Sequence, residues 1–303
     1  MQTPTEGRTG ITAAVAAYTM WGFFPLYFLA LRSVSAFELL FERVIFAVPL
    51  GLAIILWRRQ TRETLAGMTS PRVLGVLVLT ALFIAVNWLL YIIAVQNGQI
   101  FQASLGYYIN PLIYVLVGVV VLGERLRRAQ VAAVGIAAVG VGVLTIYGGA
   151  FPWIALILAG SFTVYGYLRK VVGIGAMPGL FIETVLLLPL AVIGLVILER
   201  TSGTAIAEAG PGLVAALAFA GPATVIPLLC FAVAARRLRL ATLGFLQFIG
   251  PSLQFVIGLL AGEPFTPATA VCFAMIWTAA AVFAVDAWRA SHPAVPTPRP
   301  AEA

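Results

Sequence analysis

The sequence has little charge. Asp, Glu, Lys and Arg make up 10% of its 303 residues, whereas soluble domains carry about 25%. Hydrophobic residues make up 62%, and the mean hydropathy is +1.05. A soluble fold of this length cannot bury so much apolar surface. The composition therefore predicts an all-α integral membrane protein in contact with the lipid bilayer.

The sequence also lacks the residues on which most enzymes and metal sites depend. Its one histidine, His292, lies in a Pro- and Ala-rich tail, and its two cysteines, Cys230 and Cys272, lie in apolar runs. It contains no nucleophile motif, no metal-binding motif and no phosphate-binding loop. We therefore expect no catalytic residue, no metal site and no cofactor.

Ten apolar runs are long enough to cross a membrane, since a spanning helix needs about 20 residues. No stretch alternates in polarity as the strands of a membrane β-barrel do. Short loops join the runs, so neighbouring helices are expected to be antiparallel. The runs cover residues 11–31, 37–57, 72–95, 101–121, 129–148, 151–168, 178–198, 212–234, 240–261 and 267–288.

Basic residues are concentrated in alternate loops. If the N-terminus is cytoplasmic, all of the 18 basic residues except Arg32, Arg43 and Arg200 fall in cytoplasmic segments. The positive-inside rule then predicts ten helices with both termini in the cytoplasm. The net charge is +7, but the basic residues lie in short loops between the apolar runs rather than on one face. Nucleic acid is therefore not expected as a partner.

Two similar segments indicate an internal repeat. QASLGYYINP (102–111) resembles LATLGFLQFIGP (240–251), but neutral residues precede the first and AARRLR precedes the second. A repeat unit of five helices explains the difference, because the second copy enters the membrane from the opposite side and the positive-inside rule then requires the basic loop. The predicted regions are an N-terminus (1–10), two inverted repeats (11–148 and 151–288) and a disordered tail (289–303).

The longest stretches resemble a known family. NWLLYIIAVQNGQIFQASLGYYINPL (87–112), LGERLRR (122–128) and VIPLLCFAVAARRLRLATLGFLQFIGP (225–251) are similar to RarD-type proteins of the EamA branch of the drug/metabolite transporter superfamily. The resemblance implies ten helices, a bacterial-type inner membrane and transport of small metabolites or drugs. Some related chains carry a histidine before the arginine of the second run. This chain has Glu42 before Arg43, so no proton-linked role of that histidine is carried over.

Two charges inside apolar runs are the first candidates for function. Arg43 and Glu183 fall opposite each other when Pro49 is aligned with Pro189. Charges within a membrane are costly and usually face a cavity or a partner helix. They are expected either to bind the two ends of a zwitterion or to change partners during transport. The alternatives are a structural salt bridge, a helix-end anchor or two unrelated charges.

Polar and aromatic residues give a second set of candidates, which line a cavity or form hydrogen bonds between helices. Pro111 and Pro251 are candidate hinges, because proline removes a backbone hydrogen bond. Tryptophan is alternatively a membrane-interface residue. The candidate residues of the substrate pathway, besides Arg43 and Glu183, are Trp21, Asn87, Trp88, Tyr91, Ser104, Tyr107, Tyr108, Asn110, Gln247 and Gln254.

Inverted repeats are typical of secondary transporters, whose substrate site lies between the halves near the middle of the membrane. The sequence therefore predicts a transporter of small amphipathic or zwitterionic solutes that works by alternating access. Proton coupling through Glu183 and facilitated diffusion both stay open, and the sequence indicates no oligomeric state. The alternative functions are a non-saturable channel and a non-transporting membrane protein, such as a lipid-handling or sensory module.

Overall fold

The computed structural model describes residues 4–122, 126–149, 151–207, 209–238 and 240–291. The described residues form helices, turns and loops, with no β-strand among them. The helices are α1 (Pro4–Gly22), α2 (Phe24–Ala30), α3 (Ala36–Trp57), α4 (Thr61–Thr69), α5 (Pro71–Gln96), α6 (Ile100–Leu122), α7 (Arg128–Gly148), α8 (Trp153–Val171), α9 (Ala176–Ser202), α10 (Pro211–Ala218), α11 (Ala220–Arg237), α12 (Leu240–Leu246), α13 (Ile249–Leu260) and α14 (Pro267–Ser291).

Within the described residues, eight helical segments are long and apolar enough to cross a membrane. One of them combines α1 with α2, and another combines α10 with α11. The remaining two expected runs contain α6, which has 23 residues, and the pair α12–α13. The protein is therefore an α-helical integral membrane protein, as expected, and the count of ten spans stays a prediction.

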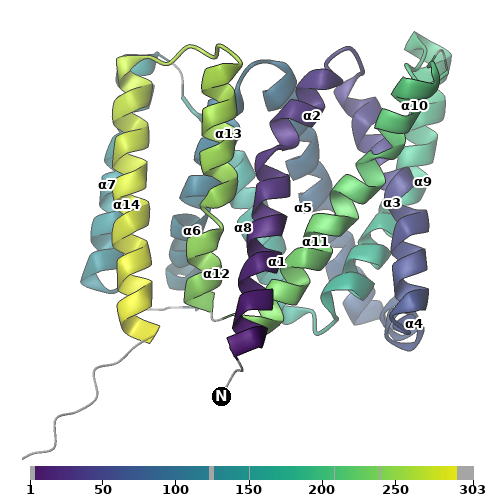
Figure 1. The fold of residues 1–303 in the computed structure, drawn as a ribbon, viewed down its shortest axis with the longest axis horizontal. Helices are drawn as coiled ribbons and strands as arrows, with labels where there is room; N and C mark the ends of the chain where they lie inside the picture. The colour runs from purple at the N-terminus through teal and green to yellow at the C-terminus, as the bar shows by residue number, and fades with distance from the viewer. Residues whose placement is uncertain (1–3, 123–125, 150, 208, 239, 292–303) are drawn as a thin grey trace, which may run out of the picture.

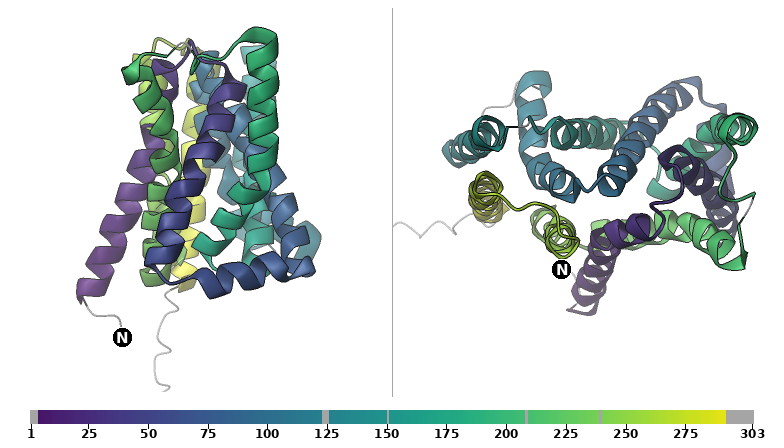
Figure 2. Two further views of the ribbon diagram at one scale, coloured as in Figure 1. Left: turned by 90° about the vertical axis from the view of Figure 1, so that its right-hand side faces the viewer. Right: turned by 90° about the horizontal axis from the view of Figure 1, so that it is seen from above.

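The long helices are arranged in two facing rows that are closed at one end (Figures 1 and 2). The nearer row of Figure 1 contains α14, α12–α13, α1 and α11, and the farther row contains α7, α6, α8 and α5, while α3 and α9 close one end. The main packing partners are α7 with α14, α1 with α11, α3 with α9, α6 with α8, α5 with α8, α3 with α11, and α6 with α13. The functional candidates Arg43 on α3 and Glu183 on α9 therefore lie on the helices of the closed end, and those on α5 and α6 lie on helices of the farther row.

Two of the spans are interrupted at a phenylalanine. Phe23 separates α1 from α2, and Phe219 separates α10 from α11. A proline follows each interruption, Pro25 in α2 and Pro222 in α11. Because proline has no N–H group, it cannot donate to the carbonyl four residues earlier, and the helix is weakened there. A third interruption separates α12 from α13 just before Pro251.

The loop between the second and third runs contains a short helix, α4, at the lower end of Figure 1. Glu63 of α4 accepts a hydrogen bond from the Gly175 amide at 2.8 Å, which ties α4 to the loop between α8 and α9. Gly67 faces Ile174 and Ile182, and a Cβ atom at Gly67 would lie 2.4 Å from the Ile174 side chain. The segment is therefore packed against the protein.

Candidate functional site

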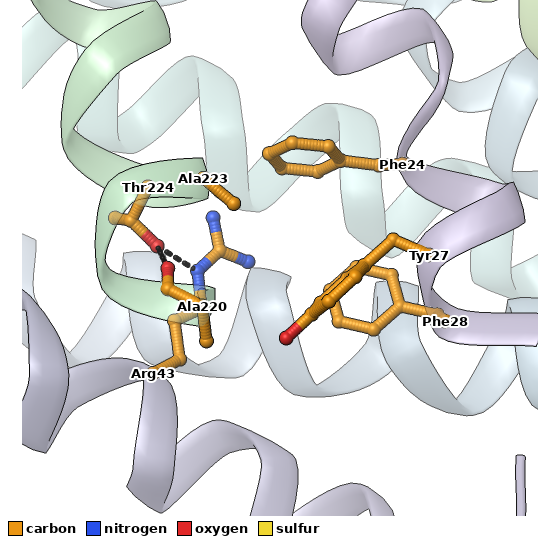
Figure 3. Close-up of a pocket in the computed structure, with 7 residues that line it drawn as sticks. All are labelled: Phe24, Tyr27, Phe28, Arg43, Ala220, Ala223 and Thr224. Carbon is orange, nitrogen blue, oxygen red and sulfur yellow. Dashed lines mark hydrogen bonds between the residues drawn. The ribbon is translucent and has the colours of Figure 1, made fainter. Parts of the chain in front are cut away.

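A buried pocket lies where α2, α3 and α11 meet (Figure 3). Arg43 enters it from α3, and Figure 3 shows its guanidinium group between α11 on one side and the aromatic rings of α2 on the other. The cavity has a volume of about 10 Å³, which is the lower limit for one water molecule. A solute can therefore enter only after the helices separate. The other lining residues are Phe24, Tyr27, Phe28, Ala220, Ala223 and Thr224.

Arg43 is a buried cation held by a hydroxyl group and by aromatic rings. Arg43 is 5% exposed. Its Nε donates to Thr224 Oγ1 at 2.7 Å. Its guanidinium carbon lies 4.0 Å from the centre of the Trp88 ring and 5.5 Å from that of Phe24, within the range of cation–π attraction. No described carboxylate lies within 4 Å of it.

The two helix interruptions adjoin this pocket, and side chains from other helices bind the carbonyl groups there. Pro25 cannot donate to the carbonyl of Trp21, and Gln254 Nε2 of α13 donates to that oxygen at 3.2 Å. The Tyr27 hydroxyl donates to the carbonyl of Ala216, near the end of α10, at 2.9 Å. Backbone groups freed in a membrane need such partners. Gln254, a candidate from the sequence, therefore connects α13 with α1.

Glu183 lies in a second polar cluster, apart from the Arg43 pocket, and is 1% exposed. Thr80 Oγ1 donates to its Oε1 at 2.6 Å, and the Tyr165 hydroxyl donates to its Oε2 at 3.3 Å. Arg169 Nε lies 3.6 Å from Oε1. In this conformation Glu183 is therefore paired with Arg169, which is the salt-bridge alternative for this residue.

A series of aromatic rings connects the two charged sites. From the pocket, Phe28 lies 6.0 Å from Tyr91, and Tyr91 lies 5.8 Å from Tyr107, as measured between ring centres. Phe162 lies 6.1 Å from Tyr107 and 6.0 Å from Tyr165, whose hydroxyl reaches Glu183. The structure therefore brings together Arg43, Trp88, Tyr91 and Tyr107, four candidates from the sequence, and leads from them to Glu183.

Two candidate asparagines bind α8. Asn87 Nδ2 donates to the Leu158 carbonyl and to Ser161 Oγ, both at 2.9 Å. Asn110 Oδ1 accepts a hydrogen bond from Thr163 Oγ1 at 2.8 Å. Both asparagines are buried, and these contacts connect α5 and α6 to α8 in the manner of hydrogen bonds between membrane helices.

A third group of candidates lies where α6 meets α13. Ser104 Oγ donates to the carbonyl of Pro251 at 2.8 Å, and the Tyr108 and Ser252 hydroxyls lie 2.6 Å apart. Of the two proposed hinges, Pro111 lies within the uninterrupted helix α6, whereas Pro251 follows the interruption between α12 and α13.

Two further candidates lie near the interruptions. Gln247 lies between α12 and α13. Trp21, at the end of α1, packs with Tyr18 and Phe231, and the ring centres are 5.6 Å and 5.9 Å apart. Trp21 therefore contributes to the packing of α1 on α11, whereas Trp88 is the tryptophan in contact with Arg43.

A wider cleft opens on the outside of the bundle, with a volume of about 430 Å³. It is mostly apolar, and its hydroxyl groups come from Tyr108 and Ser252. It lies between α6 of the farther row and α13 and α14 of the nearer row, and it shares no lining residue with the Arg43 pocket, so the two are separate. Its lining residues are Tyr108, Phe248, Ser252, Phe255, Val256, Trp277 and Ala280.

Glu263, in the loop between α13 and α14, holds the first turn of α6. Its two carboxylate oxygens accept hydrogen bonds from the Phe101 amide at 3.1 Å and 2.9 Å, as a carboxylate at a helix N-terminus does. Burial raises the pKa of the Glu263 carboxyl to about 7, although the backbone donors oppose this shift. The group therefore titrates close to neutral pH.

Several residues of these sites were not among the sequence candidates, notably Thr80, Thr163, Arg169 and Thr224. The distribution of basic residues predicts a cytoplasmic segment at Arg169, but α8 extends past this residue, and its side chain is only 13% exposed. A carboxylate within a membrane helix needs a buried partner, and this need of Glu183 was the one sign in the sequence that a basic residue such as Arg169 lies beside it. Threonines are common in membrane helices, so nothing in the sequence distinguishes these three from the others. Among the described residues, no group of His, Cys, Asp and Glu could hold a metal ion.

The architecture and the sites define the class of the protein as a polytopic α-helical membrane protein with a polar and aromatic interior. Residues 8–147 match the EamA-like transporter family. An uncharacterized transporter of Vibrio cholerae is 45% identical over 95% of this chain and 96% of its own. Protein RarD of Escherichia coli is 42% identical over 93% of this chain and 96% of its own.

A more distant relative, the chloramphenicol-sensitive protein RarD of Pseudomonas aeruginosa, is 30% identical over 92% of this chain and 95% of its own. A solved crystal structure shares the fold with a TM-score of 0.60 at 22% identity, and covers 94% of this chain and 98% of its own. The chain belongs to the EamA-like transporter family, as a RarD-type member. It is thus a bacterial multi-pass membrane transporter of the drug/metabolite superfamily, and the family contains transporters rather than enzymes.

Proposed function

We propose that the protein is a secondary transporter of small amphipathic or zwitterionic metabolites or drugs in a bacterial inner membrane. It has ten spans in two inverted five-helix repeats, with both termini in the cytoplasm. The distribution of basic residues supports this orientation. In it, the helix ends near α2 and α10 in Figure 1 face outward, and α4 faces the cytoplasm.

The packing of the helices supports the inverted repeat. Exchanging each span for its counterpart five spans later exchanges the two facing rows. The exchange turns the α1–α11 contact into the α8–α5 contact, and the α11–α3 contact into the α5–α9 contact. Counterparts also pack directly on each other as α3 with α9, α6 with α13, and α7 with α14. Such a pseudo-two-fold arrangement is the basis of alternating access in many transporters.

The observation that carries the proposed function is the series of aromatic rings between Arg43 and Glu183. It extends from α2 along α5, α6 and α8, and it has a charged group at each end. Aromatic walls suit the apolar part of a solute, and the isolated charges suit a polar group. Arg43 lies toward the outer side in the proposed orientation, and Glu183 lies toward the cytoplasm.

The occluded pocket favours a carrier over a channel. A cavity of about 10 Å³ requires the helices to move for each solute that passes, and such a cycle saturates. Protons are the candidate coupling ion, because Glu183 is a buried titratable group on the pathway. Facilitated diffusion without a coupled ion is the alternative.

The test is counterflow in proteoliposomes. Vesicles with the purified protein are preloaded with amino acids, small aromatic metabolites and chloramphenicol, and the uptake of each labelled compound is measured. We expect saturable counterflow of at least one compound, with protein-free vesicles as the control. Uptake that rises linearly with concentration would indicate a channel instead.

One observation favours a second function, the handling of lipids. The cleft between α6, α13 and α14 is open to the outside of the bundle and has hydroxyl groups at Tyr108 and Ser252. Movement of fluorescent phospholipids between leaflets in the same vesicles tests it. Lipid movement that Tyr108→Phe slows, together with an absence of counterflow, would support this second function.

A further inference from the structure

We propose that Arg43 binds a carboxylate group of the transported solute, so that the preferred substrates are small amphipathic monocarboxylates. The proposal rests on the proposed transport function and specifies the solute for the same pathway. In it, the carboxylate binds the guanidinium group, and the apolar body of the solute packs against the aromatic rings beside it.

Arg43 has no counter-ion among the described residues. Arg43 is 5% exposed, and no described carboxylate lies within 4 Å of it. A buried charge without a partner is expensive in a membrane protein. Glu183, the other buried charge considered above, has Arg169 as its partner. The cation at Arg43 is therefore available for an anion that the protein itself does not provide.

The guanidinium group of Arg43 has donors that remain free to bind a ligand. The only hydrogen bond of the guanidinium group to a described residue uses Nε, which is bound to Thr224 Oγ1. The two terminal nitrogens point into the pocket (Figure 3). They present parallel N–H groups that match the two oxygens of a carboxylate. Thr224 itself donates to the carbonyl of Ala220 at 2.8 Å. Its oxygen is therefore oriented to accept the Nε–H, and it fixes the orientation of the guanidinium group.

Aromatic rings surround the guanidinium group. Trp88 and Phe24 lie against the cation, and Tyr27 and Phe28 line the pocket. The Tyr91 ring lies 6.0 Å from that of Phe28, and its hydroxyl is buried without a hydrogen-bond partner among the described residues. An apolar body attached to a carboxylate therefore finds aromatic contacts next to the charge.

A purely structural role explains these features less well. If Arg43 only connected α3 with α11, a neutral amide could bind Thr224 without the cost of a buried charge. A zwitterion fits less well than a monocarboxylate, because Arg43 is the only charged residue among the seven that line the pocket. Glu42 is the nearest acid in the sequence and has a buried oxygen without a partner, but it does not line the pocket.

Entry of the solute requires the pocket to open, and the spans can bend for this at the helix interruptions. Phe24 and Ala220 of the pocket directly follow the interruptions at Phe23 and Phe219. The bond from Tyr27 to the Ala216 carbonyl connects the two interrupted spans across the outer end. Breaking this bond lets α2 and α10 move apart over Arg43.

The test measures binding of matched compounds to the purified protein in nanodiscs. Phenylacetate, indoleacetate and hexanoate are each compared with the corresponding neutral amide, and phenylalanine and phenethylamine represent a zwitterion and a cation. We expect at least one carboxylate to bind about 10- to 100-fold more tightly than its amide, the size of a charge-assisted hydrogen bond. Arg43→Gln should remove this ratio, and Arg32→Gln, which removes an exposed arginine, should leave it unchanged.

A second variant keeps the test valid if Arg43→Gln does not fold. Thr224→Val retains the cation but removes the acceptor that orients it, so the carboxylate-to-amide ratio should fall by about 3- to 10-fold while amide binding is unchanged. A ratio near one in the native protein, the absence of binding by all three carboxylates, or a ratio that survives Arg43→Gln would overturn the proposal.

Counterflow of the same compounds separates the two proposals. Selective carboxylate binding without counterflow would keep the Arg43 site and reject the carrier. Saturable counterflow of amides, phenethylamine or phenylalanine without a preference for carboxylates would keep the carrier and reject the role of Arg43. Counterflow selective for carboxylates supports both.

Discussion

Gly221 provides a sharp test of the contact between α3 and α11, on which the Arg43 site depends. A Cβ atom at Gly221 would lie 2.3 Å from the Phe46 carbonyl oxygen and 2.6 Å from its carbonyl carbon. Both are backbone atoms of α3, so rotation of a side chain cannot relieve the overlap. Gly221→Ala therefore forces the two helices about 1 Å apart if the contact is to reach an ordinary van der Waals distance.

The expected cost follows from this separation. Overpacking a tight contact costs about 1–3 kcal/mol, and the better helix propensity of alanine offsets at most about 1 kcal/mol. We expect a net loss of about 1–2 kcal/mol and a Tm lower by about 2–8 °C. The same displacement lengthens the 2.7 Å bond from Arg43 to Thr224, so solute affinity should fall as well.

The assay is thermal unfolding of the purified protein in one detergent, followed by counterflow. Gly142→Ala in α7 is the matched control, because a Cβ atom there meets nothing within 4 Å, and its Tm should be equal or higher. A Gly221→Ala protein with the Tm and affinity of the native protein would refute the close approach of α3 and α11.

Three further predictions concern the other sites. Gln254→Leu leaves the Trp21 carbonyl without its donor and should lower stability by about 1–3 kcal/mol, whereas Gln247→Leu should have a smaller effect; equal Tm values for both variants would contradict this role of Gln254. Thr80→Val removes a donor to buried Glu183 and should destabilise by about 1–3 kcal/mol, and Thr278→Val, on the exposed face of α14, serves as its control. The native Glu263 carboxyl, with its pKa near 7 raised from 4.5, binds a proton that the unfolded chain has released; its contribution to stability is therefore complete below about pH 4.5 and is lost as the pH rises to about 7. Between pH 5 and 8 the Tm of the native protein should fall more than that of Glu263→Gln, and parallel Tm curves would show that Glu263 does not titrate there.

The sequence was sufficient for the helical class, and it selected several residues that the structure brings together. Hydropathy predicted apolar helices because a long apolar run has few alternatives to a membrane helix, and eight of the helical segments are long and apolar enough to cross a membrane. Buried charge singled out Arg43 and Glu183, and the structure places Trp88, Tyr91 and Tyr107 near Arg43. These residues share the property of being costly or unusual within lipid.

The partners of the charges were less accessible from the sequence. The pairing of Glu183 with Arg169 depends on how α8 packs beside α9, and Arg169 lies at a helix end where a basic residue is unremarkable. Thr224 lies 181 residues from Arg43 in the chain. Such contacts arise from the tertiary arrangement, which local periodicity does not encode.

The bond from Gln254 to the Trp21 carbonyl has a consequence for motion. A main-chain hydrogen bond fixes the angle between successive turns of a helix, but a side-chain amide can rotate and follow the carbonyl as that angle changes. The end of α1 can therefore tilt relative to α2 while its oxygen stays bound, so the tilt does not expose a polar backbone group to the acyl chains. The energy needed to bend the span at Phe23 is then determined by the packing of the aromatic rings around it. Smaller rings at Trp21 or Phe24 would lower this energy, while the Trp21 carbonyl would keep its hydrogen bond to Gln254.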